Sequence, residues 1–196
     1  MRQLGLAVAN YHSDHGEMPP AYIADEDGKP MHSWRVLILP YLDDEQALYD
    51  QYDFDEPWNG PNNRKLADQL THHPFFCPSD DSLQPSITSY VAVVGERTLW
   101  PGAESGAGED FSEHANIVSI VEVVDSGIHW MEPRDLSFED AIAAAEGEDR
   151  PGLGSRHSGS LIYVGYADTH VSPLSEEEIT GEKLTELLTV KRSGGG

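Results

Sequence analysis

Apolar residues recur with a helical period at the start of the chain. Leu4, Ala7, Val8 and Tyr11 stand at positions i, i+3, i+4 and i+7, which places them on one face of an α-helix. No Ser, Thr, Asp or Asn precedes this stripe as a cap, although helices usually begin with one. We therefore expect residues 1–14 to be the C-terminal end of a longer helix.

A dense apolar run follows at 33–42. Its period fits either a helix or a buried strand, and we favour a helix up to Pro40. Two further helices are predicted at 43–52 and 60–70, the second with a proline in its first turn, where proline is well tolerated.

From residue 75 onward the pattern is that of β-structure, with runs of β-branched residues between turn residues. The strands are predicted at 89–95, 116–124, 127–131, 161–168 and 169–174. The second and third are expected to form one hairpin, and the last two another. Short helices are predicted after Ser137 and Ser175, each of which has the chemistry of an N-cap.

Helices thus come first and strands later, so the fold class is α+β with an antiparallel sheet and short helical insertions. The length of 196 residues fits one domain over 1–196. Its glycine-rich end, 192–196, is expected to be a flexible tail.

The charge of the chain narrows its possible partners. Acidic residues outnumber basic ones by 35 to 12, which gives a net charge of −23 with His neutral and a pI near 4.4. Such a field repels nucleic acid and anionic membranes, so we expect no nucleic-acid partner. Two interpretations stay open: a solvated acidic surface, or carboxylate clusters that bind divalent cations.

Calcium is the cofactor that the acidic loops favour, because it prefers carboxylate and carbonyl oxygens. Asp53, Asp55 and Glu56 alternate with other residues as calcium ligands often do, although no EF-hand pattern is present. Similar loops contain Asp25/Glu26/Asp27, Asp43/Asp44/Glu45 and Glu109/Asp110. Solvated turns are the alternative for all of them.

A transition metal is a second candidate. Asp168 and His170 share one face of a predicted strand, and His157, Asp125 and His129 are expected nearby. The alternative is ordinary turn chemistry, in which the Asp side chain accepts hydrogen bonds from its own backbone.

Catalytic residues are not expected. Cys77 is the single cysteine, which excludes an intramolecular disulfide, and the two phenylalanines before it indicate a buried thiol rather than a partner of His72 or His73. Ser126 with His129 resembles part of a triad, but the Gly-x-Ser-x-Gly elbow is absent.

The tryptophans leave a ligand-binding alternative open. A face of exposed aromatic rings would suit a glycan, whereas Trp is more often a partly buried core residue. The four tryptophans are Trp34, Trp58, Trp100 and Trp130.

Three segments carry a resemblance to a known family. They read QLGLAVANYHSDHGEMPPAY (3–22), SWRVLILPYLDDEQALYDQYDFDEPWNGPNNRKLADQ (33–69) and FFCPSD (75–80). In this order they resemble a large bacterial family of unknown function, DUF1559, which is abundant in planctomycetes. That family has a prepilin-type N-terminal cleavage and methylation segment and was once labelled as solute-binding.

The family's C-terminal signature is a His, nine residues and then Asp-Gly, and the segment SRHSGSLIYVGYADTHV (155–171) resembles it. The corresponding residues are His157, Asp168 and His170. Ten residues separate His157 from Asp168, and Thr169 stands in place of the Gly. The extra residue predicts a bulge or a shifted register in this hairpin.

The resemblance implies a pilin-like fold, in which a truncated N-terminal helix attaches to the sheet through the Leu4, Ala7, Val8 and Tyr11 stripe. The missing leader and apolar half-helix would be the only contact with a membrane. The acidic head would then be extracytoplasmic, in the cell envelope, the periplasm or at the surface.

The implied function is that of a non-catalytic pilin- or pseudopilin-like structural subunit, with self-assembly or other pilin-like subunits as partners. Because calcium pins a loop of the head in related pseudopilins, Asp53, Asp55, Glu56 and Asp168 are its candidate ligands. The alternative is an envelope module that binds calcium, a glycan or a small solute.

Overall fold

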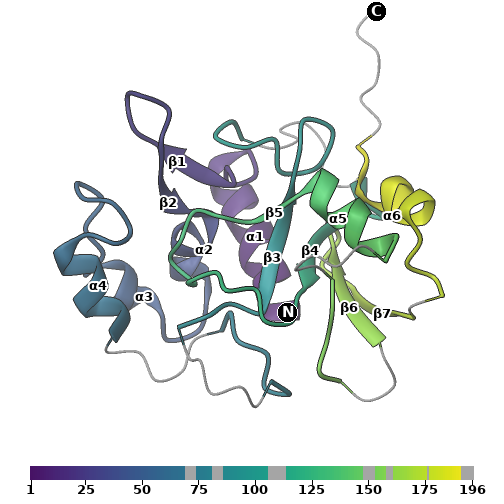
Figure 1. Cartoon of the computed structure of the whole chain (residues 1–196). Helices are drawn as coiled ribbons and strands as arrows, with labels where there is room; N and C mark the ends of the chain where they lie inside the picture. Colours follow the sequence, from purple (N-terminus) through teal and green to yellow (C-terminus); the bar gives the residue numbers. More distant parts are fainter. Residues whose placement is uncertain are drawn as a thin grey trace, which may run out of the picture.

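The computed structural model describes residues 1–68, 74–80, 86–105, 114–147, 153–157, 161–175 and 177–190. The helices are α1 (Arg2–His15), α2 (Trp34–Leu37), the 3-10 turn η1 (Leu39–Tyr41), α3 (Gln46–Tyr49), α4 (Pro61–Asp68), α5 (Phe138–Ala145) and α6 (Gly181–Leu188). The strands are β1 (Tyr22–Ala24), β2 (Pro30–Ser33), β3 (Tyr90–Val94), β4 (Val118–Glu122), β5 (Leu136–Ser137), β6 (Leu161–Tyr166) and β7 (Val171–Ser175). The fold is α+β, as predicted (Figure 1).

The main sheet has the strand order β5-β3-β4-β6-β7. Adjacent strands in this sheet run antiparallel, except for β3 and β5, which run parallel to each other. The expectation of a purely antiparallel sheet is therefore corrected at this edge. After β4 the chain passes through residues 123–135 and returns to the edge of β3 that faces away from β4. This path sets the direction of β5.

The predicted hairpin of 116–124 with 127–131 is wrong. Both edges of β4 are already occupied, by β3 and β6, and 127–131 makes only an isolated bridge between His129 and Ile87. Asp125 and Gly127 both have positive φ, of 50° and 60°, which turns the chain away from β4. By contrast, β6 and β7 form the predicted hairpin.

The two faces of the sheet bury separate apolar clusters, because successive strand residues point to opposite sides. On one face, α1 contributes the buried Leu4, Ala7 and Val8 to a cluster that contains Ala92 and Ile120. Tyr11 packs half-buried against the same cluster.

On the opposite face α5 and α6 cover the sheet. Ala141 of α5 and Leu184 and Leu188 of α6 share a second cluster with Val91 and Val121 of the central strands. The sheet is thus enclosed between α1 on one side and α5 with α6 on the other.

Helix α1 ends at His15, within one residue of the predicted 1–14, and its C-cap Gly16 has φ of 76° and donates its N–H to the His12 carbonyl at 2.8 Å. Full burial of a leucine such as Leu4 stabilises the fold by about 1.5–3 kcal/mol. None of the helices in the described ranges combines the length and the apolar character that crossing a membrane requires.

Two helix predictions need correction. The helix predicted at 43–52 is reduced to the four residues of α3, because Asp44 before it has a φ of 66°. Ser175 does not cap the last helix but ends β7, and Thr180 caps α6 by accepting from the Lys183 N–H at 3.2 Å. The predicted cap Ser137 does open α5.

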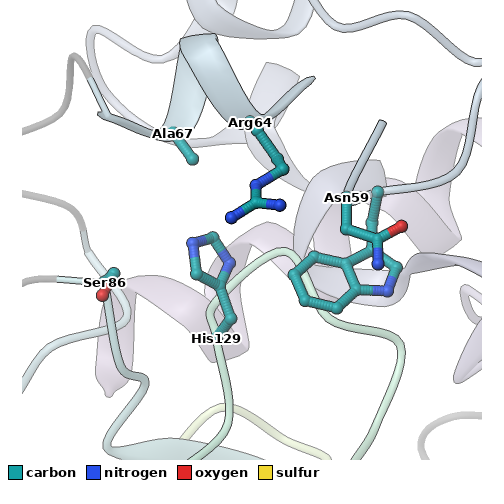
Figure 2. A pocket seen from close by; sticks show the side chains of 6 residues that line it. Asn59, Arg64, Ala67, Ser86 and His129 are labelled. Atoms are coloured by element: carbon teal, nitrogen blue, oxygen red, sulfur yellow. The ribbon is translucent and has the colours of Figure 1, made fainter. Parts of the chain in front are cut away.

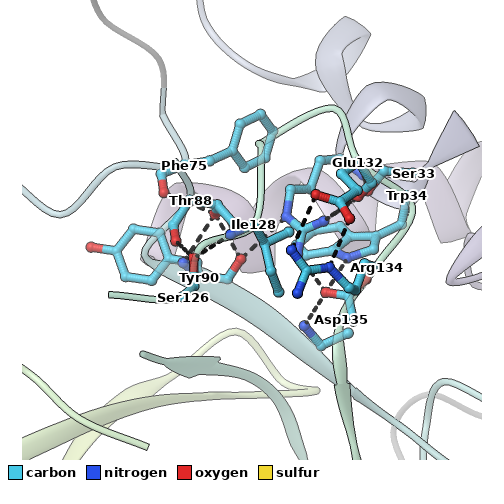
Figure 3. A network of polar contacts seen from close by, with 12 residues as sticks. Ser33, Trp34, Phe75, Thr88, Tyr90, Ser126, Ile128, Glu132, Arg134 and Asp135 are labelled. Atoms are coloured by element: carbon cyan, nitrogen blue, oxygen red, sulfur yellow. Dashed lines mark hydrogen bonds and ion pairs between the residues drawn. The ribbon is translucent and has the colours of Figure 1, made fainter. Parts of the chain in front are cut away.

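A buried ion pair joins α2 to the sheet. The Arg35 side chain is fully buried and pairs with Asp135, which also accepts from the Trp34 indole N–H at 3.2 Å and from the Ala92 N–H of β3 at 2.8 Å. Ser33 Oγ accepts a further bond from Arg35 at 2.9 Å. Trp34 and Asp135 mark this network in Figure 3.

Candidate functional site

Three residues with metal-ligand chemistry meet from three separate segments. They are Cys77 in the loop before β3, Glu122 at the end of β4, and His157. One ligand atom from each lies within 4.8 Å of the other two. The Cys77 sulfur is 3.4 Å from His157 Nε2, and the same nitrogen is 3.5 Å from Glu122 Oε1. We call this group the Cys77–Glu122–His157 cluster.

The loop that contains Cys77 is held against the start of β3 by backbone hydrogen bonds. The Cys77 N–H donates to Ser89 Oγ at 3.0 Å, and the Ser89 N–H donates to the Phe75 carbonyl at 2.8 Å. Phe75 is fully buried and stacks on Trp130, with ring centroids 5.6 Å apart. Cys77 is only 3% exposed, in agreement with the predicted buried thiol.

Glu122 is a carboxylate inside the fold. It pairs with Tyr90 across β4 and β3 and alternates with Ile120, so its side chain lies on the α1 face of the sheet. The residue is 1% exposed, and its Oε2 accepts no hydrogen bond from the described residues. A buried carboxylate oxygen without a donor is costly, and a cation beside it would offset that cost.

The segment that carries His157 is anchored on the loop 77–80. The Ser79 hydroxyl is 3.2 Å from His157 Nδ1, and Arg156 Nε donates to the Asp80 carboxylate at 2.9 Å. Arg156 Nη2 forms an ion pair with the Asp125 carboxylate at 2.9 Å. Two segments about 80 residues apart in the sequence therefore meet through three side-chain contacts.

The surroundings keep the thiol protonated at neutral pH. Burial raises the pKa of Cys77, and a hydrogen bond to the Glu122 carboxylate raises it further. A nucleophilic cysteine needs the opposite shift, because the thiolate is the reactive form. The contact between Cys77 and His157 therefore lacks the activation of a thiol–imidazole catalytic pair.

The N-terminal end of α1 lies beside the cluster. Met1 packs against the apolar cluster that contains Cys77 and Tyr90. The cluster therefore lies at the end of the sheet where β3 begins and β4 ends, and Figure 1 shows the start of α1 beside β3 there.

Comparison with known proteins places the chain in a family. The profile described as "Protein of unknown function (DUF1559)" matches residues 1–140. The chain belongs to the DUF1559 family. The match includes Cys77 and Glu122 and ends before His157. No curated protein and no solved structure matches the chain.

In this DUF1559 protein the three residues that were matched by resemblance to the C-terminal signature lie in two separate places. His157 joins Cys77, whereas Asp168 and His170 pair with each other in the β6–β7 turn, where the His170 ring stacks on Tyr166 at 4.0 Å. Of the other predicted transition-metal ligands, Asp125 pairs with Arg156 as described above. The β6–β7 pairing itself has no bulge.

The irregularity lies on the other side of β6. The register of β4 against β6 shifts between Val118 and Ile120, so the bulge is in β4. It lies outside the segment 157–168 and does not account for the additional residue between His157 and Asp168. The bulged residue Ser119 gives its carbonyl to the Trp100 indole N–H at 2.7 Å. The predicted bulge in the hairpin strands is thereby corrected.

The predicted calcium ligands serve local structure. Glu56 Oε1 accepts the N–H groups of Asn62 and Asn63, each at 2.7 Å, in the first turn of α4. Asp53 Oδ1 accepts from the Asp55 N–H at 3.0 Å. Within the described ranges, the cluster at Cys77 is the one group of three His, Cys, Asp or Glu residues close enough to share an ion. Calcium binding stays a prediction, and Glu109 and Asp110 lie outside the described residues.

The Ser126–His129 pair does not form. Ser126 Oγ donates to the Thr88 carbonyl at 2.6 Å, and His129 Nδ1 accepts from the Met131 N–H at 3.1 Å (Figure 3 shows Ser126 and Thr88). His72 and His73, which the sequence disfavours as partners of Cys77, lie outside the described residues.

Three of the four tryptophans are core residues, as favoured over the alternative of an aromatic binding face. Trp34, Trp100 and Trp130 are at most 1% exposed and belong to the core. Trp58 instead lines a cavity of about 340 Å³ with its ring tilted over His129 at 5.3 Å. Figure 2 shows Arg64 and His129 facing each other across it.

Glu122 is the residue of the cluster that sequence reasoning did not single out. A signal for it exists in the sequence, because Glu122 is the only carboxylate in the β-branched run at 116–124. It stands two residues after Ile120, so both side chains point to the same face of the strand. An acidic residue is rarely fully buried without a partner.

Proposed function

We propose that this DUF1559 chain is the head of a pilin-like structural subunit in a bacterial envelope or secretion-type assembly. The observation that carries the proposal is the packing of α1 across the sheet through Leu4, Ala7 and Val8. A pilin-like subunit needs this arrangement, because its helix must hold the head on one side and contact other subunits on the other.

The outer side of α1 is consistent with such contacts. Leu6 is 44% exposed, and Leu6 and Ile23 are the exposed large hydrophobic residues in the described part of the chain. Single exposed apolar residues are common, so Leu6 supports the proposal without carrying it. The charge of −23 favours heads that stay solvated and face away from anionic lipid.

The role is structural and not catalytic. The thiol of Cys77 has a raised pKa, and Ser126 is hydrogen-bonded to a backbone carbonyl rather than to a histidine. Neither arrangement supplies an activated nucleophile.

Site-directed crosslinking in cells that produce the whole gene product tests the proposal. In an assembly built through the helix, Leu6→Cys gives disulfide-linked dimers under mild oxidation, because each chain then carries one accessible thiol besides the buried Cys77. Ile23→Cys is the matched control, because Ile23 is similarly exposed at 37% but lies on β1. Monomers alone from both variants, at equal protein levels, contradict the proposal. Equal yields of dimer from both variants indicate association that does not depend on α1 and contradict the proposal as well.

A further inference from the structure

We propose that Cys77, Glu122 and His157 together bind one transition-metal ion of the zinc class. The ion would tie the 77–80 loop and the 153–157 segment to the end of β4, at the end of the sheet where α1 begins. This site adds a ligand and a stabilising link to the proposed structural subunit, and it does not depend on that role.

The donor set selects the metal. A thiolate sulfur, an imidazole nitrogen and a carboxylate oxygen are the ligands that Zn²⁺ takes in proteins. Calcium and magnesium take oxygen ligands, so a sulfur and a nitrogen in a set of three exclude them as the preferred ions. Three protein ligands leave one position of a tetrahedron for water or another group.

The observed spacing already matches a shared ion. Bonds of about 2.3 Å to sulfur and about 2.0–2.1 Å to nitrogen or oxygen place tetrahedral neighbours about 3.6 Å apart for S and N, and about 3.3 Å apart for N and O. The corresponding distances are 3.4 Å from Cys77 to His157 and 3.5 Å from His157 to Glu122. The third separation, between the Cys77 sulfur and the Glu122 carboxylate, lies within 4.8 Å, so a side-chain adjustment of at most about 1.2 Å brings it to the tetrahedral value of about 3.6 Å.

The next layer of contacts orients the imidazole. With the ion on Nε2, the proton of His157 sits on Nδ1, which then donates to Ser79 Oγ at 3.2 Å. Arg156 holds the same segment on Asp80 at 2.9 Å. Such outer contacts fix the ring so that Nε2 faces Cys77 and Glu122.

Charge balance favours a divalent ion here. The ion displaces the thiol proton of Cys77 to solvent, so the product contains M²⁺, one thiolate, one carboxylate and one neutral imidazole. The sum of charges is zero, and a neutral complex is the least costly one to bury. The ion also supplies a partner for the Glu122 carboxylate, whose Oε2 accepts no hydrogen bond from the described residues.

Cobalt(II) titration of the reduced chain is the direct test. Co²⁺ replaces Zn²⁺ in such sites and gives a thiolate-to-cobalt charge-transfer band only when sulfur is a ligand. The chain has one cysteine, so the band reports Cys77 alone. We expect the band to saturate at one Co²⁺ per chain and to disappear when Zn²⁺ is added. Its absence with excess Co²⁺ in the unmodified chain overturns the proposal, whatever the variants do.

Variants separate a three-residue site from a lone thiol. Cys77→Ser should abolish the band, and Glu122→Gln or His157→Gln should weaken Co²⁺ binding more than Ser79→Ala, for which loss of an outer contact predicts a roughly 10-fold effect. His170→Gln is the matched control, because His170 also faces a carboxylate but lies in the β6–β7 turn. Unchanged affinity in both Glu122→Gln and His157→Gln contradicts the site.

Zn²⁺ should also raise the thermal midpoint of the unmodified chain by several degrees, since it binds the folded state. Mg²⁺ at the same concentration should leave the midpoint unchanged. Equal shifts with both ions would point to general screening of the acidic surface and count against the cluster.

Discussion

Thr169 holds a conformation that does not suit its side chain. It lies in the turn between β6 and β7 with a φ of 74°, where a β-branched residue is strained by about 1–2 kcal/mol. The signature that this segment resembles has glycine at the same position, which adopts positive φ without strain.

Replacing Thr169 with glycine should therefore stabilise the protein. Relief of the strain exceeds the extra freedom that glycine gains in the unfolded chain, and we expect a net gain of about 0.5–1 kcal/mol. Thr169→Ala is the control, since it keeps the Cβ and the strain and should give no gain. Urea unfolding measures both. A loss of stability in Thr169→Gly would mean that packing of Thr169 beside α1, where a Cβ on Gly5 would come within 3.7 Å of the Thr169 Cβ, outweighs the strain.

At the scale of elements, the Arg35–Asp135 pair joins α2, β3 and the chain before β5. Both side chains are at most 2% exposed. Asp135→Asn should lower the free energy of unfolding by about 3–5 kcal/mol, because it leaves the Arg35 charge buried without a counter-charge. Arg134→Gln is the control, since Arg134 is 53% exposed in its pair with Glu132 and should cost about 1 kcal/mol or less. Urea unfolding measures the loss of unfolding free energy in both variants. Similar losses would contradict the argument that the Arg35–Asp135 pair matters more because it is buried.

The elements that the sequence predicts well are those with local signals. β3, β4 and the β6–β7 hairpin follow from β-branched runs, and α5 follows from its Ser137 cap. The parallel pairing of β5 has no local signal, because two adjacent residues acquire a partner only when the chain returns to β3. The hairpin predicted for 116–124 with 127–131 was wrong, because hydrophobic alternation does not reveal which edges of a strand are already paired with other strands.

The same difference in scale explains the candidate site. The sequence points to Cys77 as a buried thiol and to His157 through its signature, each from its own neighbours. Only the packed molecule places them 3.4 Å apart and adds Glu122 from a third segment. The predicted union of His157 with Asp168 and His170 assumed one local motif, whereas His157 is anchored on the 77–80 loop.

At the scale of the whole molecule, buried phenols make the fold sensitive to alkali. Burial raises the pKa of Tyr52 and Tyr90, each 6% exposed, and raises that of Tyr41 to about 12. Because the folded pKa exceeds the unfolded value near 10, this stability is complete below about pH 10 and is lost as the pH rises beyond it.

Each deeply buried phenol should cost about 1.4 kcal/mol of unfolding free energy per pH unit in that window. Urea unfolding at several pH values between about 8 and 11.5 measures the slope. Tyr52→Phe loses the hydrogen bond to His32, so its free energy of unfolding at pH 8 should be lower than that of the unmodified protein. Above pH 10 its free energy of unfolding should fall less steeply by about 1.4 kcal/mol per pH unit, which is the contribution of one phenol. An unchanged slope in this variant would assign the alkaline loss to repulsion within the −23 charge instead of to Tyr52.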